Sequence, residues 1–183
     1  MDRATAVDLD ALIRKIPDHP EPGILFYDLM PLLQAPAGLN AVVERMADHG
    51  RSLDPHVVVG AEARGFIAGG ALAKSLGVGF AAARKPGKLP AEVIEQEYDL
   101  EYGTDRLALH RDAITPGSRV LLHDDLLATG GTAEAQVRMI ERLGGQVVGL
   151  VFIVELAFLP GRERLADYPI HSLLTYDSEA VDA

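Results

Sequence analysis

The sequence contains no cysteine among its 183 residues, which excludes disulfide bonds, thiol catalysis and thiolate metal sites. It also lacks an apolar run of the length that crosses a membrane. The first residues, "MDRATAVDLDALIRKI", include acids and no continuous apolar segment. They predict an amphipathic first helix and not a secretory signal. We therefore expect a soluble, cytoplasmic protein with no membrane partner.

Basic residues are scarce: 17 Lys and Arg stand against 27 Asp and Glu, for a formal net charge of -10. Binding to nucleic acid relies on cationic surfaces, so we expect no such partner. Residues 63–91 nevertheless contain no acid, where an even spread would place about four. This acid-free segment favours an anionic small-molecule substrate, although an ordinary solvated surface also fits. Its cations are Arg64, Lys74, Arg84, Lys85 and Lys88.

Several familiar catalytic motifs are absent as well. No Walker A loop, H-E-x-x-H or G-x-S-x-G occurs, so ATPase and hydrolase classes lose their usual support. "GVGFAA" at residues 77–82 matches G-x-G-x-x-A, but its glycines precede a predicted strand instead of following one. A dinucleotide site is therefore not predicted.

The chain alternates short apolar runs with segments of helical period, within a length typical of one domain. This alternation predicts an α/β fold whose central, mostly parallel sheet is flanked by helices. Residues 17–33, rich in proline, predict an ordered irregular flap, and residues 93–110 a protruding hairpin. The predicted strands are 56–60, 77–83, 120–122, 146–156 and 171–176, and the predicted helices are 40–49, 65–76 and one from Thr132.

Ligands of such sheets bind beyond the carboxyl ends of the strands. Three loops follow predicted strand ends: "AEARG", "RKPGK" and "DDLLATGGT". Basic residues and a glycine-rich loop are thus expected on one rim of the sheet.

The loop "DDLLATGGT" combines features of a phosphate and a sugar site. Gly130 and Gly131 permit close approach of a phosphate to the backbone at a helix start, and the hydroxyls of Thr129 and Thr132 add donors. Asp124 and Asp125 would repel that phosphate, so they are expected to face sugar hydroxyls or hydrated Mg²⁺. The alternative is a strand end followed by an ordinary glycine turn.

The run "VLLHDDLLATGGT" resembles the phosphoribosyl pyrophosphate (PRPP) loop of type I phosphoribosyltransferases. Over nearly its whole length, through "IPDHPEPGILFYD", "EARGF", "RKPGKLP", "YDLEYGTD" and "VELAFLPGRERL", the chain is similar to the adenine phosphoribosyltransferase family. The resemblance implies one domain over residues 1–183, with an N-terminal helix and base-binding hood at 1–35 and a mobile catalytic hairpin at 91–110. It implies adenine and PRPP as substrates, AMP and pyrophosphate as products, Mg²⁺ as cofactor and a homodimer. Relatives acting on 6-oxopurines carry an acid where this chain has Ala128.

The resemblance also assigns the site residue by residue. The implied catalytic residues are Arg64, Glu101 and Tyr102, with Glu101 near N7 of the base. PRPP phosphate and ribose are assigned to Asp124, Asp125, Ala128, Thr129, Gly130, Gly131 and Thr132; pyrophosphate to Arg64, Arg84, Lys85 and Lys88; and adenine to Leu25, Phe26, Tyr27 and Leu126. Asp124 and Asp125 would organise the metal. The peptide that matches Glu62-Ala63 is cis in relatives. Simple solvation of Glu101 and core packing of Leu126 are the alternatives.

Two residues depart from the family pattern. Tyr27 stands where relatives commonly have Arg, and His123 replaces an aliphatic residue before the two acids. Either His123 is a neutral histidine at a strand end, or its protonated form stabilises the acids and makes PRPP affinity depend on pH. Two other functions stay open: transfer to a different or modified purine, which Tyr27 would favour, and PRPP sensing without catalysis.

Overall fold

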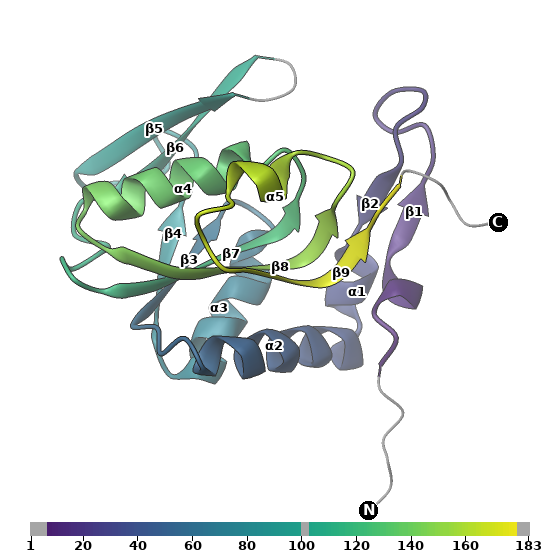
Figure 1. Ribbon diagram of the computed structural model, residues 1–183, viewed down its shortest axis with the longest axis horizontal. Helices are drawn as coiled ribbons and strands as arrows, with labels where there is room; N and C mark the ends of the chain where they lie inside the picture. Colours follow the sequence, from purple (N-terminus) through teal and green to yellow (C-terminus); the bar gives the residue numbers. More distant parts are fainter. Residues whose placement is uncertain (1–6, 100–102, 179–183) are drawn as a thin grey trace, which may run out of the picture.

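Five parallel strands form the central sheet of the computed structural model, which describes residues 7–99 and 103–178 (Figure 1). The strand order is β4-β3-β7-β8-β9, and each neighbouring pair is parallel. The strands are β3 (Val57–Ala61), β4 (Gly79–Ala83), β7 (Arg119–Leu127), β8 (Gln146–Leu156) and β9 (Ile170–Tyr176). The predicted α/β class is confirmed, with the last strand at the edge as expected.

Helices cover both faces of this sheet, as Figure 1 shows. On one face lie α2 (Pro36–Arg51) and α3 (Gly65–Leu76), and on the other α4 (Gly131–Arg142) and α5 (Gly161–Arg164). Alternating side chains of β7 serve the two cores, because successive residues of a strand point to opposite faces. Leu122 packs with α4, whereas Leu121 packs with α2 and α3. No helix among the described residues is both long and apolar enough to cross a membrane.

The N-terminal segment does not form the predicted first helix over its described part. Residues 7–16 contain only a single helical turn, η1 (Asp10–Leu12), followed by β1 (Arg14–Ile16). β1 pairs antiparallel with β2 (Phe26–Asp28), and this pairing outweighs the helical pattern of the local sequence. With α1 (Met30–Gln34), these elements make up the described part of the hood, residues 7–35.

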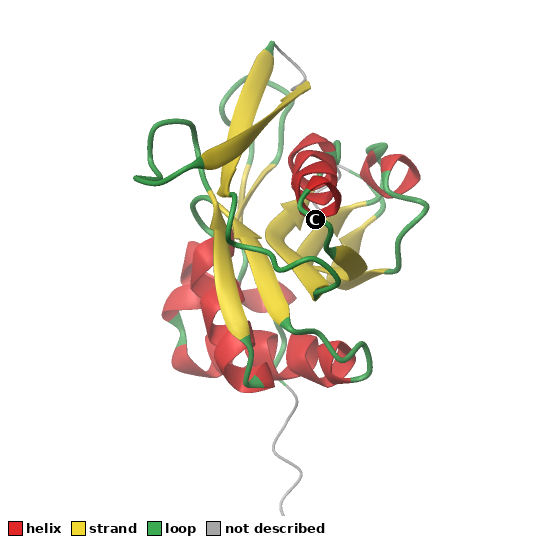
Figure 2. Ribbon diagram, turned by 90° about the vertical axis from the view of Figure 1, so that its left-hand side faces the viewer, coloured by secondary structure: helices red, strands yellow, loops and turns green. Residues whose placement is uncertain are grey.

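A separate two-stranded hairpin, β5 (Val93–Asp99) and β6 (Thr104–His110), projects from the sheet, and Figure 2 shows it at the top of the molecule. Its base is joined to the end of β4 by two backbone hydrogen bonds between Arg84 and Ala108. Arg142 of α4 donates to the Glu95 carbonyl at 3.0 Å. The predicted protruding hairpin is confirmed.

The prediction that the strand at residues 120–122 ends before the two acids is wrong. β7 continues to Leu127, because β8 pairs with it along this whole length. On its other side β3 pairs with β7 only as far as Gly60 and His123. Asp124 and Asp125 therefore lie within a strand, at the point where one neighbouring strand has already ended.

Candidate active site

The ends of β3, β4 and β7 place three loops at one edge of the sheet, as the sequence predicts. Residues 62–64 follow β3, residues 84–88 follow β4, and residues 128–130 follow β7 and lead into α4. The Glu62-Ala63 peptide is cis, in agreement with the implied geometry before Arg64. Residues far apart in the sequence thus meet at this edge.

Arg64 connects the hood to the acid pair, which consists of Asp124 and Asp125. Its Nε lies 2.6 Å from Asp125 Oδ2, and its guanidinium carbon lies 5.8 Å from the centroid of the Phe26 ring. The Arg64 side chain is 35% exposed and that of Asp125 only 9%, so the cation reaches from solvent to a buried carboxylate. An apolar ring, a cation and a carboxylate from β2, the start of α3 and β7 therefore stand in sequence across the site.

The acid pair is tightly held. The Asp125 N–H donates to Asp124 Oδ1 at 2.9 Å, and a Cβ on Gly65 would approach that oxygen to 2.9 Å. Only glycine lets the start of α3 lie so close to Asp124. Desolvation raises the pKa of Asp124 well above its usual range, and the negative charge of Asp125 raises it further. A bound cation would relieve this repulsion.

These two carboxylates suit a hard, oxygen-binding cation such as Mg²⁺. No group of three or more His, Cys, Asp or Glu side chains in residues 7–99 and 103–178 is arranged to hold a metal by itself. Mg²⁺ commonly keeps several waters and uses one or two carboxylates together with substrate phosphates. The donor set therefore fits an ion that is shared with a phosphorylated substrate.

The phosphate loop, residues 128–132, turns the chain from β7 into α4. Gly130 has φ +79°, a left-handed conformation that glycine adopts without strain, and it precedes the first helical residue. The N–H groups of a helix's first turn lack partners within the helix and attract anions. Thr129 and Thr132 are half-buried here, and only Leu126 and Leu127 separate the loop from Asp125 along the chain.

Two of the basic residues after β4 have carboxylate partners. Arg84 Nε lies 3.1 Å from Glu62 Oε2, and the ammonium group of Lys85 contacts Asp105 of β6. The Arg84 hydrogen bond lowers the pKa of Glu62, so this carboxylate stays charged at neutral pH. Lys88 is exposed. Two cations of the acid-free segment are thus paired with acids that lie outside the segment.

In the hood, the side chain of Phe26 and the side chains of its two chain neighbours lie on opposite faces of the strand. Leu25 and Tyr27 are buried against the core, whereas Phe26 is half-buried on the opposite face. Tyr27 stacks on Tyr176 of β9, with ring centroids 4.4 Å apart. Tyr27 therefore shares no face with Phe26, and it can meet a ligand beside Phe26 only through its backbone. Leu126 of β7 is half-buried against the same core.

Glu101 and Tyr102 lie outside the described residues. They belong to residues 100–102, which connect Asp99 at the end of β5 to Gly103 before β6. Their assigned roles stay predictions.

His123 of β7 is fully buried and directly precedes the acid pair in the sequence. Its Nδ1 is 3.0 Å from the Val151 carbonyl oxygen, and a Cβ on Gly69 would lie 3.1 Å from its ring. Burial lowers the pKa of His123 to about 4, although the Val151 carbonyl and Asp125 oppose the shift. Desolvation exceeds those two attractions, which favours the neutral form of His123 over the protonated form at neutral pH.

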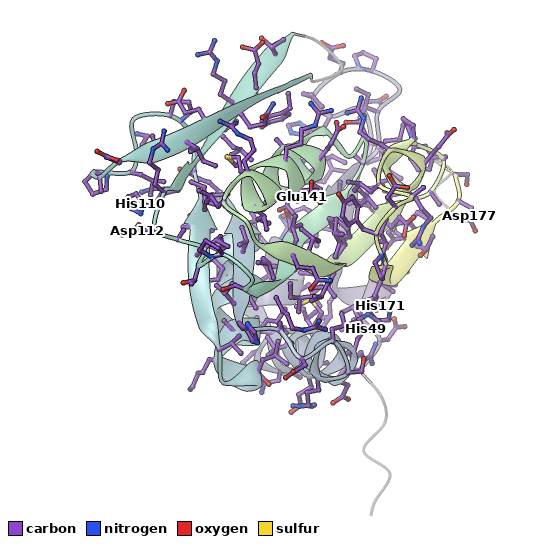
Figure 3. All side chains as sticks on the ribbon, turned by 60° about the vertical axis from the view of Figure 1, so that its left-hand side comes forward. His49, His110, Asp112, Glu141, His171 and Asp177 are labelled. Atoms are coloured by element: carbon purple, nitrogen blue, oxygen red, sulfur yellow. The ribbon has the colours of Figure 1, made fainter. Side chains whose placement is uncertain are left out.

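A second titratable cluster lies away from this edge. The rings of His49 in α2 and His171 in β9 stack in parallel with centroids 4.2 Å apart (Figure 3). Burial lowers the pKa of His49, and His171 lowers it further.

Sequence reasoning missed the residues that support the site from behind. Gly65 lies within the motif "EARGF", but a glycine that starts a helix carries no signal of the carboxylate that needs its space. The pairing of Glu62 with Arg84 and of Asp105 with Lys85 depends on which loops meet. The one sequence signal for these pairs is the position of Glu62 at the border of the acid-free segment, next to the cations of that segment.

Comparison with known proteins agrees with this geometry. A family model for the phosphoribosyl transferase domain matches residues 31–174. The adenine phosphoribosyltransferase of Solibacter usitatus is 56% identical over 170 residues, which cover 93% of this chain and 98% of that protein. The crystal structure of the Thermoanaerobacter pseudethanolicus adenine phosphoribosyltransferase has a TM-score of 0.89 and 47% identity, covering 92% and 98% of the two chains. That of Saccharomyces cerevisiae, complexed with an imino-altritol bisphosphate and adenine, has a TM-score of 0.87 and 37% identity, covering 91% and 96%.

The parallel sheet, the phosphate loop and the matched domain define the class of this protein as a phosphoribosyltransferase. The proteins most of whose length this chain matches narrow that class to one family. The chain belongs to the adenine phosphoribosyltransferase family.

Proposed function

We propose that this protein transfers the 5-phosphoribosyl group from PRPP to adenine, which yields AMP and pyrophosphate for purine salvage. The observation that carries the proposal is the series Phe26, Arg64 and Asp125 beside the phosphate loop. It offers an apolar face for a base, a cation for a leaving anion and a carboxylate for sugar hydroxyls within one site. Ala128 adds no charge to the loop, which is consistent with adenine in place of a 6-oxopurine.

The phosphate loop is proposed to bind the 5'-phosphate of PRPP. The backbone N–H groups at the start of α4 and the hydroxyls of Thr129 and Thr132 are the donors. Ala128, Gly130 and Gly131 contribute backbone, and their small size leaves room for the anion. Asp124 and Asp125 accept hydrogen bonds from the ribose hydroxyls.

Mg²⁺ is the proposed cofactor, held near Asp124 and Asp125 through water or PRPP. When bound, it would neutralise charge on the pyrophosphate leaving group. The raised pKa of Asp124 supports this assignment, since two close carboxylates gain from a neighbouring cation.

Cations of this chain are proposed to bind the pyrophosphate. Arg64 is placed best, because its half-exposed guanidinium lies beside Asp125. Arg84 and Lys85 lie across the edge, and their partners Glu62 and Asp105 orient them. Lys88 adds an exposed charge. As the bond from ribose C1 to pyrophosphate breaks, positive charge develops on the sugar and negative charge on the leaving group, so positioning and electrostatics supply most of the catalysis.

Adenine is proposed to lie between Phe26 and Leu126. Phe26 presents a half-buried ring on the site side of β2. Leu25 and Tyr27 contribute backbone groups on either side of it, since their side chains are buried in the core. Tyr27 is the best support for a different base, and the stacking of its side chain on Tyr176 favours adenine by placing that side chain away from Phe26.

Glu101 is proposed to accept a proton from the base near N7, with Tyr102 beside it. A general base needs reach and a suitable pKa. The connection between β5 and β6 is the segment that would bring it to the base and exclude water.

The test is turnover by purified protein with PRPP and Mg²⁺. AMP formation that depends on adenine supports the proposal, and tight PRPP binding without turnover on any base would favour a PRPP-sensing protein. A homodimer is also proposed, on family resemblance, and light scattering on the eluting protein measures it.

A further inference from the structure

The phosphate loop is backed by the chain around α5, far away in sequence. A Cβ on Gly161 would lie 2.2 Å from the Ala128 carbonyl oxygen and 2.8 Å from Leu127 Cδ1. A Cβ on Gly130 would lie 3.0 Å from the Gly161 carbonyl oxygen. The two backbones therefore touch at glycines, and no side chain fits between them. Figure 1 shows α5 beside α4 on this face of the sheet.

The residue after Gly161 anchors this contact. Arg162 Nε lies 2.6 Å from Glu155 Oε1, and its Nη2 lies 2.5 Å from Glu155 Oε2. Such a two-pronged arginine–carboxylate pair fixes both position and orientation. Arg162 thereby fixes the backbone of the adjacent Gly161.

Glu155 is itself rigidly placed. Its side chain is 2% exposed, and Ser172 Oγ of β9 donates to Oε2 at 2.7 Å. Glu155 lies near the end of β8, where it is in register with Leu127, the last residue of β7 before the phosphate loop. Hydrogen bonds from Arg162 and Ser172 lower the pKa of Glu155, so the carboxylate remains charged at neutral pH. The anchor thus belongs to the sheet.

The far end of α5 is linked to α4. Arg164 Nε lies 3.8 Å from Glu134 Oε2 in the first turn of α4, and the Arg164 N–H donates to the Pro160 carbonyl at 3.0 Å. The loop needs outside support, because Gly130 has no side chain and no side-chain hydrogen bond caps α4. The packing of Gly161 against the loop and the ion pair between Arg164 and Glu134 supply this support.

We propose that Glu155, Arg162 and Gly161 form a positioning unit that holds the phosphate loop in the geometry that binds the 5'-phosphate of PRPP. None of the three is proposed to touch substrate. The inference rests on the proposed function, in which this loop binds PRPP. A phosphate site made of backbone N–H groups depends on backbone placement, and small displacements of such groups are costly.

The test is steady-state kinetics with each substrate varied separately, on Arg162→Gln and Gly161→Ala. We expect the KM for PRPP to rise about tenfold or more, because the loop shifts, while the KM for adenine changes less than about twofold. Arg162→Lys keeps the charge but not the two-pronged contact, so it should recover only part of the loss. Matched controls are Arg51→Gln, which breaks an exposed ion pair with Asp48 on α2, and Gly70→Ala, where a Cβ meets nothing within 4 Å. Both controls should keep the wild-type KM for PRPP.

Two results would overturn the positioning unit. One is an unchanged KM for PRPP in folded Arg162→Gln. The other is a parallel change in both KM values and kcat that follows the loss of thermal stability, which indicates a merely structural role. Thr132→Val separates this inference from the proposed function. If Thr132→Val raises the KM for PRPP and Arg162→Gln does not, only the positioning unit fails. If Thr132→Val and Gly161→Ala, which displaces the loop backbone, both leave the KM for PRPP unchanged in an active enzyme, the loop is not the phosphate site, and both fail.

Discussion

Replacing His123 by valine should make the protein less sensitive to acid. His123 is 0% exposed, and burial lowers its pKa from 6.5 to about 4. The folded state therefore favours the neutral ring. The contribution of this preference to the free energy of unfolding is complete above pH 6.5 and falls as the pH drops from 6.5 towards 4. The full loss, reached below pH 4, amounts to about 3 kcal/mol, and about 2.5 kcal/mol of it falls between pH 7.5 and 4.5.

Urea unfolding of wild type and His123→Val at pH 7.5 and 4.5 measures this effect. Carboxylates also titrate in this range, but they are common to both proteins and cancel in the difference. The variant lacks the titrating group, so its stability relative to wild type should increase by about 2.5 kcal/mol on acidification. A change smaller than about 0.5 kcal/mol, or one of opposite sign, would refute the reasoning. The opposite sign is what a charged His123 paired with Asp125 would produce.

Three further predictions concern the hood, the acid pair and the proton acceptor. Tyr176→Ala removes the ring on which Tyr27 stacks and the hydroxyl that donates to Asp10. The KM for adenine should therefore rise about fivefold or more, while the KM for PRPP stays within about twofold. A parallel rise in both KM values would contradict the separation of hood and phosphate loop. Gly65→Ala places a Cβ 2.9 Å from Asp124 Oδ1, and displacement of that carboxylate should reduce kcat/KM for PRPP by about tenfold; Gly70→Ala in the same helix should leave it unchanged. Glu101→Gln should lower kcat by about a hundredfold with little change in either KM, and full turnover would exclude Glu101 as the proton acceptor.

Elements with strong local signals were predictable from the sequence. The helix at residues 65–76 coincides with α3, because its apolar pattern ends at Gly77, which adopts φ +72° and closes the helix. The strand at residues 146–156 coincides with β8, because a central strand of a parallel sheet is buried on both faces and reads as one apolar run.

Elements that depend on distant pairing were not predictable. The first helix fails because β1 finds a partner in β2, and the end of β7 is misplaced because β8 extends the pairing beyond His123. No local pattern encodes either partner.

The candidate site follows the same division. Its edge of the sheet was predictable, since the carboxyl ends of parallel strands meet there and the loops "AEARG", "RKPGK" and "DDLLATGGT" carry the polar residues. The burial of Tyr27, the neutral state of His123 and the contact between Gly161 and the phosphate loop depend on packing between segments far apart in the chain.

The most direct test of the central claim is pyrophosphate release by the purified protein with PRPP and Mg²⁺, measured with adenine, hypoxanthine, guanine, xanthine or no base. The account predicts release with adenine alone, accompanied by an equal amount of AMP. Release with a 6-oxopurine and not with adenine, or PRPP binding without release on any base, would contradict it.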